Sequence, residues 1–286
     1  MALELVPAEP KHINEIGRIC FEAFKSIHDK HVFPRDFPDV ELAIKVVGML
    51  VERKDFYGVV ALLEGKPVGS NFSSLMDEVS GIGPITVDPA CQTRGIGRAL
   101  MEGVVNYAKR NNIEKIRLLQ DSFNMASLSL YTSLGFDVKE TVVLMEAVPA
   151  SKADQTVRSI TENDLAVIEG LSRRIYKVSR INEVASAFVY GFPAFLRERD
   201  GRVTGYLLPG FFGHGVAETE EDALALIGES ARRIPPEFAR FFCPLRQEKF
   251  FRTALRNGCR AIKVMNLMAV GPYEPPQDVW MPSILY

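Results

Sequence analysis

The stretch from Ile85 to Leu100 constrains the fold more than any other part of this sequence. It predicts an apolar strand, a loop broken by glycines and then an amphipathic helix over residues 95–110. Asp88-Pro89 ends the strand, because proline cannot continue a central ladder. The two loop glycines let the backbone turn sharply and approach a ligand closely. The free amides and the positive dipole end of the helix therefore predict a site for a phosphate or pyrophosphate group.

The loop matches neither of two common phosphate-binding patterns. No Gly-Lys-Ser/Thr follows it, as a P-loop requires, and Gly95-x-Gly97-x-x-Leu100 lacks the third glycine of a dinucleotide fingerprint. The spacing Gln92-x-x-Gly95-x-Gly97, directly after a Val-Asp-Pro strand end, is more distinctive. From this loop alone, the alternative is a strand, a turn and a helix that use glycine only to turn.

A second motif follows downstream. Residues 113–120 predict another strand, and the segment from Asn124 to Phe136 has the pattern Asn-x(6)-Tyr-x-x-x-Gly-Phe. Asn124 and Tyr131 are seven residues apart, so on a helix they share one face. Gly135 stands where a glycine commonly ends a helix, and Phe136 begins the next predicted strand.

Taken together, the two motifs resemble those of the Gcn5-related N-acetyltransferase (GNAT) superfamily over about residues 1–147. The resemblance implies an α/β fold, in which helices flank a mixed central sheet, and a loop whose amides bind the pyrophosphate of acetyl-CoA. The element order expected from the residue patterns agrees: strand, two helices, three strands, helix, strand, helix, strand. The residues expected to bind the co-substrate are Ile85, Thr86, Val87, Gln92, Thr93, Arg94, Gly95, Ile96, Gly97, Arg98, Ala99, Asn124, Ser127 and Tyr131.

Residues 156–286 look like a second, degenerate copy of the same fold. Residues 148–155 show no apolar period and predict a linker, after which the pattern of strand, capped helix and hairpin restarts. At the position of the loop stands Gly210-Phe-Phe-Gly213-His-Gly215, and glutamates that would repel a pyrophosphate follow it. We therefore predict a tandem protein with domains at 1–147 and 156–286, of which only the first binds acetyl-CoA. By resemblance to a bacterial and archaeal subgroup, the second helps to build the acceptor pocket; an unrelated fold is the alternative.

Transfer of an acyl group to an amine needs a group that removes a proton and a group that protonates the leaving thiolate. The resemblance assigns Tyr131 as the proton donor, with packing of its helix as the alternative role. It also implies a backbone amide near Val87 that stabilises the thioester oxygen. The strand ahead of the loop carries no carboxylate, so Glu78, just before that strand, is the candidate base.

Other groups could remove the proton instead of Glu78. Asp77 lies just before the same strand, and Asp121 ends the next strand. A water chain from Ser80 or Thr86, or the terminal carboxylate, would also serve. The segment Gly81-Ile82-Gly83-Pro84 is unusual for a central strand and predicts a bulge or a close approach of a ligand.

Composition argues against several other classes of protein. The formal net charge of −2 and the lack of a basic block argue against nucleic acid as a partner. No apolar run reaches membrane-spanning length and no charged leader begins the sequence, which predicts a cytoplasmic protein without a membrane partner. The four cysteines and four histidines fit no metal-binding spacing, so we expect no metal.

The sequence thus predicts an acetyl-CoA-dependent N-acyltransferase. In this hypothesis, a primary amine of a small molecule attacks the thioester directly. One alternative is a CoA-binding sensor or scaffold without turnover, and another is an acetyltransferase of protein lysines or N-termini. The identity of the acceptor and the formation of a homodimer stay open at this stage.

Overall fold

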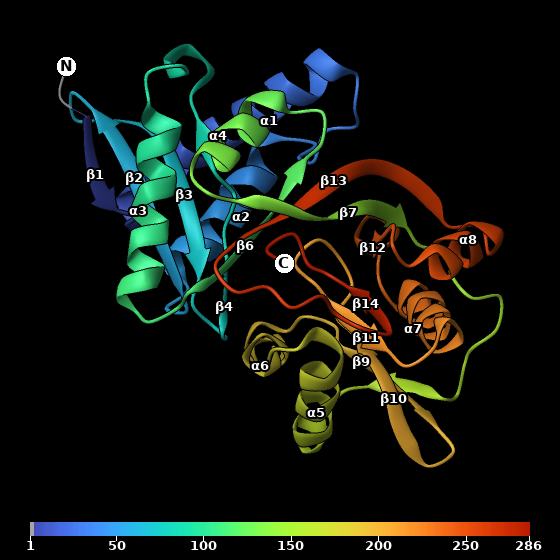
Figure 1. The fold of residues 1–286 in the computed structure, drawn as a ribbon. Coiled ribbons are helices and arrows are strands. Elements are labelled where there is room, and N and C mark those ends of the chain that lie inside the picture. The colour runs from blue at the N-terminus through green and yellow to red at the C-terminus, as the bar shows by residue number, and fades with distance from the viewer. Residues whose placement is uncertain (1–2) are drawn as a thin grey trace. The chain divides into compact units, whose positions relative to one another are not determined.

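The computed structural model describes residues 3–286, which form two compact units (Figure 1). The first unit contains residues 3–118, 122–137 and 269–271, and the second contains 119–121, 138–268 and 272–286. Each unit is thus discontinuous in sequence. The division into copies at 1–147 and 156–286 stays a prediction.

The first unit follows the predicted order of elements. It contains β1 (Leu3–Pro7), α1 (Ile13–His31), α2 (Val40–Glu52), β2 (Phe56–Leu63), β3 (Lys66–Ser74), β4 (Val79–Gly81), β5 (Thr86–Val87), α3 (Ile96–Arg110), the start of β6 (Lys115–Asp121) and α4 (Met125–Ser133). Strands β1, β2, β3 and β5 pair in that order as an antiparallel sheet. Helix α3 lies along one face of this sheet, with α1 and α2 on the other (Figure 1).

The strand expected over residues 79–87 is broken in two. β4 pairs in parallel with β6, whereas β5 pairs antiparallel with β3. The change of partner falls at Ile82, whose amide donates to Arg117 of β6 at 2.9 Å, while the amide of Gly83 donates to Phe72 of β3 at 3.0 Å. Pro84 has no amide with which to continue either ladder. The predicted irregularity at 81–84 is therefore confirmed, and it is the point where β5 and β6 begin to part.

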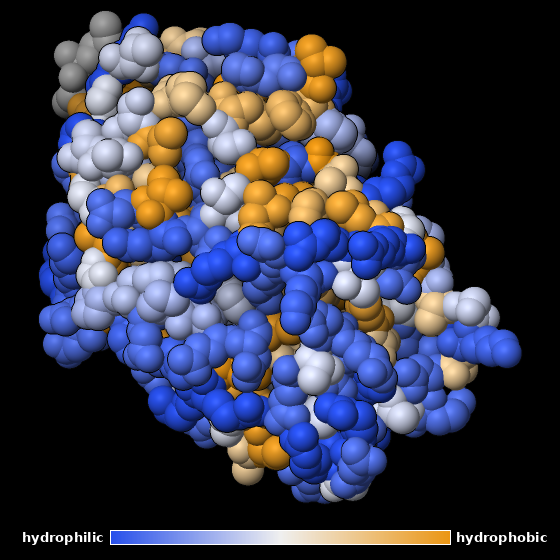
Figure 2. Space-filling view, turned by 45° about the vertical axis from the view of Figure 1, so that its right-hand side comes forward, coloured by the Kyte–Doolittle hydropathy of each residue, from blue (hydrophilic) through white to orange (hydrophobic). Residues whose placement is uncertain are grey.

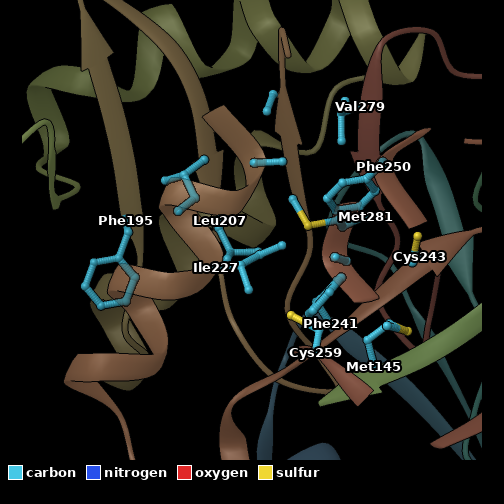
Figure 3. Close-up of a cluster of buried hydrophobic side chains, with 14 of the residues drawn as sticks. Met145, Phe195, Leu207, Ile227, Phe241, Cys243, Phe250, Cys259, Val279 and Met281 are labelled. Carbon is cyan, nitrogen blue, oxygen red and sulfur yellow. The ribbon is translucent and has the colours of Figure 1, made fainter. Parts of the chain in front are cut away.

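The second unit is built from a longer list of elements. It contains most of β7 (Asp137–Glu146), β8 (Val157–Ser159), α5 (Leu165–Tyr176), α6 (Ile181–Tyr190), β9 (Phe195–Arg199), β10 (Arg202–Leu207), β11 (Gly215–Ala217), α7 (Glu220–Arg233), β12 (Arg240–Pro244), α8 (Glu248–Arg256), most of β13 (Arg260–Val270) and β14 (Val279–Met281). One sheet has the order β14-β11-β10-β9-β8, and β12, β7 and β13 lie side by side in another. Figure 3 shows the core between them, where Ile227 of α7 packs with Phe195, Leu207 and Phe241.

Three features of the second unit differ from the sequence-based expectation. Helix α6 was not expected, although Ile181, Val184 and Ala187 follow a helical spacing. β14 was not expected either, because proline-rich residues precede it. The strand expected over 211–217 begins only at Gly215, because the amide of Leu208 bonds to the carbonyl of His214 at 2.8 Å and closes the preceding residues into a loop.

Candidate functional site

The loop after β5 has the conformation that its glycines predict. Gly95 lies in the left-handed region, at φ 78° and ψ 0°, and forms the N-cap of α3. Because glycine has no side chain, Gly95 at this N-cap position cannot accept a hydrogen bond from the first amides of α3, and these amides remain available to a ligand. Before the loop, Asp88 accepts a hydrogen bond from the amide of Ala90 at 2.9 Å, which fixes the turn that leaves the strand.

The beginning of α3 packs closely against α4. A Cβ on Gly97 would lie 3.3 Å from Cδ2 of Leu130 and 3.9 Å from Cγ2 of Val87. Arg98 donates to the hydroxyl of Ser133 at 2.7 Å and lies 3.8 Å from Glu102. The structure thus brings the loop, the end of β5 and α4 together. Gln92, Thr93, Arg94 and Gly95 are exposed around this N-terminus.

Local hydrogen bonds fix both ends of α4. The side chain of Asn124 accepts from the amide of Ser127 at 3.2 Å, and its carbonyl accepts from the Ser127 hydroxyl at 2.9 Å. At the other end, the amide of Phe136 donates to the carbonyl of Tyr131 at 3.1 Å, with Gly135 at φ 88° between them. This is the Schellman arrangement that the glycine predicts. Tyr131 is buried on this helix, at 6% exposure, and directly follows Leu130, which faces Gly97 of α3.

Strands β5 and β6 belong to two different sheets. Within residues 3–286, β5 forms a ladder with β3 only, so its other edge carries no strand partner. The loop that leads into α3 follows the carboxyl end of β5, and Asn124 follows the carboxyl end of β6 by three residues. In α/β proteins, ligands bind beyond the carboxyl ends of strands at the point where neighbouring strands diverge. The predicted co-substrate residues in the loop and on α4 therefore surround one place in the first unit.

The acidic residues considered as the base each form an ion pair with a lysine. Glu78 precedes the amino end of β4, and its carboxylate pairs with Lys115 at 3.1 Å, at the first residue of β6. It is therefore separated from the loop by the whole length of β4 and the break. In the second unit, Asp121 pairs with Lys263 at 2.8 Å, and both side chains are buried. The assignment of Glu78 as the base stays a prediction that this placement does not favour.

Two buried hydroxyls lie where a water could bind. Ser70 of β3 and Thr86 of β5 are direct cross-strand partners. Both are at least 96% buried, and within the described residues 3–286 neither hydroxyl has a hydrogen-bond partner. Buried polar groups of this kind are commonly satisfied by ordered water. Ser80, by contrast, is bonded to Ser73 at 2.5 Å, so of the two hydroxyls considered from the sequence, Thr86 is better placed for a water chain.

The corresponding helix of the second unit begins differently. α7 begins three residues after the end of β11, and its N-cap Thr219 accepts from the amide of Asp222 at 3.1 Å. The first turn carries three acidic residues, and Glu218 just before it pairs with Arg174 and Arg202 at 2.6 Å each. A capped, acidic helix end suits no pyrophosphate. That the second half does not bind CoA stays a prediction.

This arrangement coincides with a match to a known family. The model of the acetyltransferase (GNAT) family matches residues 17–136, a span that includes the loop, α3, β6 and α4. These residues form a GNAT domain. Proteins of this family use acetyl-CoA, and the loop residues fit that group, because Gly95 and Gly97 leave the helix amides uncovered.

Curated relatives match parts of the chain. An uncharacterized N-acetyltransferase of Methanocaldococcus jannaschii is 35% identical over 100 residues, which is 32% of this chain and 44% of that protein. A mycothiol acetyltransferase of Kocuria rhizophila is 38% identical over 69 residues, or 24% and 22% of the two chains. The ribosomal protein bS18-alanine N-acetyltransferase of Escherichia coli is 38% identical over 53 residues, or 18% and 36%. Each match thus spans less than half of the relative.

Solved structures match the fold along the whole chain. A proposed acetyltransferase from Pyrococcus horikoshii aligns with a TM-score of 0.78 over 97% of this chain and 92% of that one, at 18% identity. A tandem GNAT protein of the clavulanic acid biosynthesis pathway aligns with a TM-score of 0.58 over 96% and 100%, at 14% identity. At such identities the likeness shows the fold alone. It confirms the expected α/β GNAT fold with a mixed sheet and flanking helices, and one of its neighbours is a tandem protein.

The face shown in Figure 2 is mostly polar, with apolar residues distributed among charged ones. Among residues 3–286, every helix is too short or too polar to cross a bilayer.

Proposed function

We propose that this protein transfers the acetyl group of acetyl-CoA to a primary amine of a small molecule, by direct attack of the amine on the thioester. The observation that carries the proposal is the N-terminus of α3, left uncapped by Gly95 at the edge where β5 and β6 part. A helix N-terminus without a side-chain cap binds phosphate through its amides and its dipole. Arg94 and Arg98 add positive charge beside it.

The residues around this helix N-terminus can carry the steps of the transfer. The thioester of acetyl-CoA supplies the acetyl group. In this proposal, the amide of Val87 donates a hydrogen bond to the thioester oxygen, as electrostatic stabilisation of the reaction requires. The Tyr131 hydroxyl donates a proton to the leaving sulfur. Asn124 binds the pantetheine arm of acetyl-CoA and also caps α4.

The class of acceptor separates the proposal from its first alternative. Relatives named for mycothiol and for a ribosomal protein alanine both match short segments of the first half. One name refers to a small molecule and the other to a protein, so the names do not choose between these two classes of acceptor. An acetyltransferase of protein lysines or N-termini therefore stays the alternative. A CoA-binding scaffold without turnover is the second alternative. We expect a cytoplasmic location for each.

The test combines binding and turnover on the purified full chain. Isothermal titration with acetyl-CoA is expected to give one site per chain, because α7 lacks an open N-terminus. A thiol-release assay over a panel of small primary amines, with lysine peptides and an alanine-terminated peptide in parallel, then identifies the acceptor class. Binding without release from any acceptor would support the scaffold, and absence of binding would refute the proposal.

A further inference from the structure

Two tyrosines of the first unit stack on each other outside the candidate site. Tyr57 belongs to β2 and Tyr107 to α3, and their ring centroids lie 3.6 Å apart with the ring planes within 1° of parallel. Both residues are half-buried, so part of each remains open to solvent. Tyr107 lies in the last turn of α3, at the opposite end of the helix from Gly95. The pair therefore has no part in the proposed transfer.

The packing of α3 on β2 holds the two rings together. One turn before Tyr107, a Cβ on Gly103 would lie 3.7 Å from Cγ1 of Val59. Val59 follows Tyr57 by two residues, so both side chains lie on the same face of β2. Overlaid parallel rings are electrostatically less favourable than offset or edge-on rings. The close approach of helix and strand, and not attraction between the rings, therefore sets the stack.

The environment of Tyr57 keeps its phenol protonated. Burial raises the pKa of Tyr57, with a smaller contribution from Tyr107, whereas Arg110 acts in the opposite direction. The guanidinium carbon of Arg110 lies 6.0 Å from the ring centroid of Tyr107. Oxidation of this ring pair at neutral pH thus has to remove protons together with electrons.

Other tyrosines of the described chain offer a comparison. The rings of Tyr176 and Tyr286 lie 5.6 Å apart and are tilted by 59°, and neither residue is more than 2% exposed. Tyr190 of α6 is 40% exposed. The buried pair thus lacks access to solvent, and Tyr190 is accessible to a second molecule. At Tyr57 and Tyr107, contact between two phenol rings occurs together with partial access to solvent.

We propose that Tyr57 and Tyr107 are a site of oxidative cross-linking, at which a haem-type peroxidase with hydrogen peroxide joins the two rings as dityrosine. Each phenol gives one electron to the oxidant and its O–H proton to water, which leaves two radicals in contact. Their unpaired electrons form one bond between ring carbons ortho to the oxygens. Each of these carbons then releases its hydrogen as a proton, and each oxygen takes one up, so both rings are aromatic again. The rings lose two electrons and two protons in all, and hydrogen peroxide takes them to become two molecules of water.

The new bond ties β2 to the last turn of α3. A cross-link stabilises a fold mainly because it restricts the unfolded chain. We therefore expect the cross-linked chain to unfold at a higher urea concentration than the untreated chain. Binding of acetyl-CoA should be unchanged, since the loop lies at the other end of α3, and the inference does not rest on the proposed function.

The test treats the full chain, in dilute solution, with a haem peroxidase and hydrogen peroxide and then measures the intact mass. The expected product is a single chain that has lost two hydrogens, from which proteolysis releases residues 57 and 107 on one joined pair of peptides. Tyr57→Phe and Tyr107→Phe retain a stacked ring but lack the phenol, so each should lose this product. Tyr190→Phe is the matched control, which should keep the intrachain product and reduce only links between chains. Dilution should leave the intrachain yield unchanged, because both rings belong to one molecule.

The same reaction in urea separates the native stack from the general reactivity of tyrosine. Urea that unfolds the chain removes the contact, so the joined peptides should be lost. The inference is wrong if Tyr57→Phe still gives these peptides, if they form equally in urea, or if Tyr190 reacts while the folded chain stays unlinked. Treated Tyr57→Phe is also the reference for the urea midpoint, and an equal shift in that variant would contradict the stabilising role of the link.

Discussion

Replacement of Gly95 by alanine tests the loop geometry most directly. Gly95 has φ +78°, and a Cβ built on it would meet nothing within 4 Å. The cost of the substitution therefore comes from the backbone and not from a clash. Gly65, in the hairpin between β2 and β3, has the same φ and the same open space, and Gly170 in α5 has open space at an ordinary helical φ.

The magnitudes follow from these three conformations. A side chain in the left-handed region costs about 1–2 kcal/mol, so Gly95→Ala and Gly65→Ala should each lower the free energy of unfolding by that amount. Gly170→Ala should raise it by about 0.5–1 kcal/mol, because alanine favours a helix. The same substitution is thus expected to lower the free energy of unfolding at Gly65 and Gly95 and to raise it at Gly170.

The effect on binding distinguishes Gly95 from Gly65. If the loop amides hold the pyrophosphate, loss of one charge-assisted hydrogen bond costs about 1.5–3 kcal/mol, or a dissociation constant raised at least about 10-fold. Gly95→Ala should show this loss in isothermal titration with acetyl-CoA, whereas Gly65→Ala should bind normally. Urea unfolding of the full chain measures stability. Equal affinities of the two variants would refute the loop assignment, and destabilisation by Gly170→Ala would refute the conformational argument.

The other predictions concern the proton donor, the helix N-terminus and a buried histidine. Tyr131→Phe should lower turnover about 10-fold or more with acetyl-CoA binding nearly unchanged, and equal thiol release would remove Tyr131 from the mechanism. Gly97→Glu should abolish acetyl-CoA binding without unfolding the chain, because it adds a negative charge beside the pyrophosphate and 3.3 Å from Leu130; retained affinity by titration would contradict this. Burial, with a smaller contribution from Arg180, lowers the pKa of His214 well below its ordinary value. The unfolded chain then binds this proton more readily, so stability should fall below about pH 6.5, by up to ~1.4 kcal/mol per pH unit, and His214→Gln should reduce the slope of urea-unfolding free energy against pH.

The sequence predicted the local parts of the site well. Gly95, the cap Asn124 and the helix-ending Gly135 each act within a few residues, through backbone conformation and hydrogen bonds that neighbours along the chain supply. Nearly all helices and strands of the first unit were predicted for the same reason, since apolar periodicity is a local signal. The unusual residues 81–84 also predicted an irregularity, although not its form.

The choice of base shows where the sequence was insufficient. Glu78 was considered because it lies near the loop in sequence, yet β4 and the break carry it to the far end of the strands, where it pairs with Lys115. The contact between His28 and Phe123, in contrast, joins two segments that are distant in sequence, and only packing brings them together.

The sequence by itself determined the loop, the helix caps, the element order of the first unit and, by resemblance, its family. These depend on local conformation, which nearby residues fix. Only the tertiary structure decided that one predicted strand divides between two partners, and that residues 269–271 join the first unit and 119–121 the second. Those outcomes depend on which surfaces, distant in sequence, bury each other. The hydrophobic effect depends on buried area and not on sequence separation, so the sequence does not show which surfaces pair.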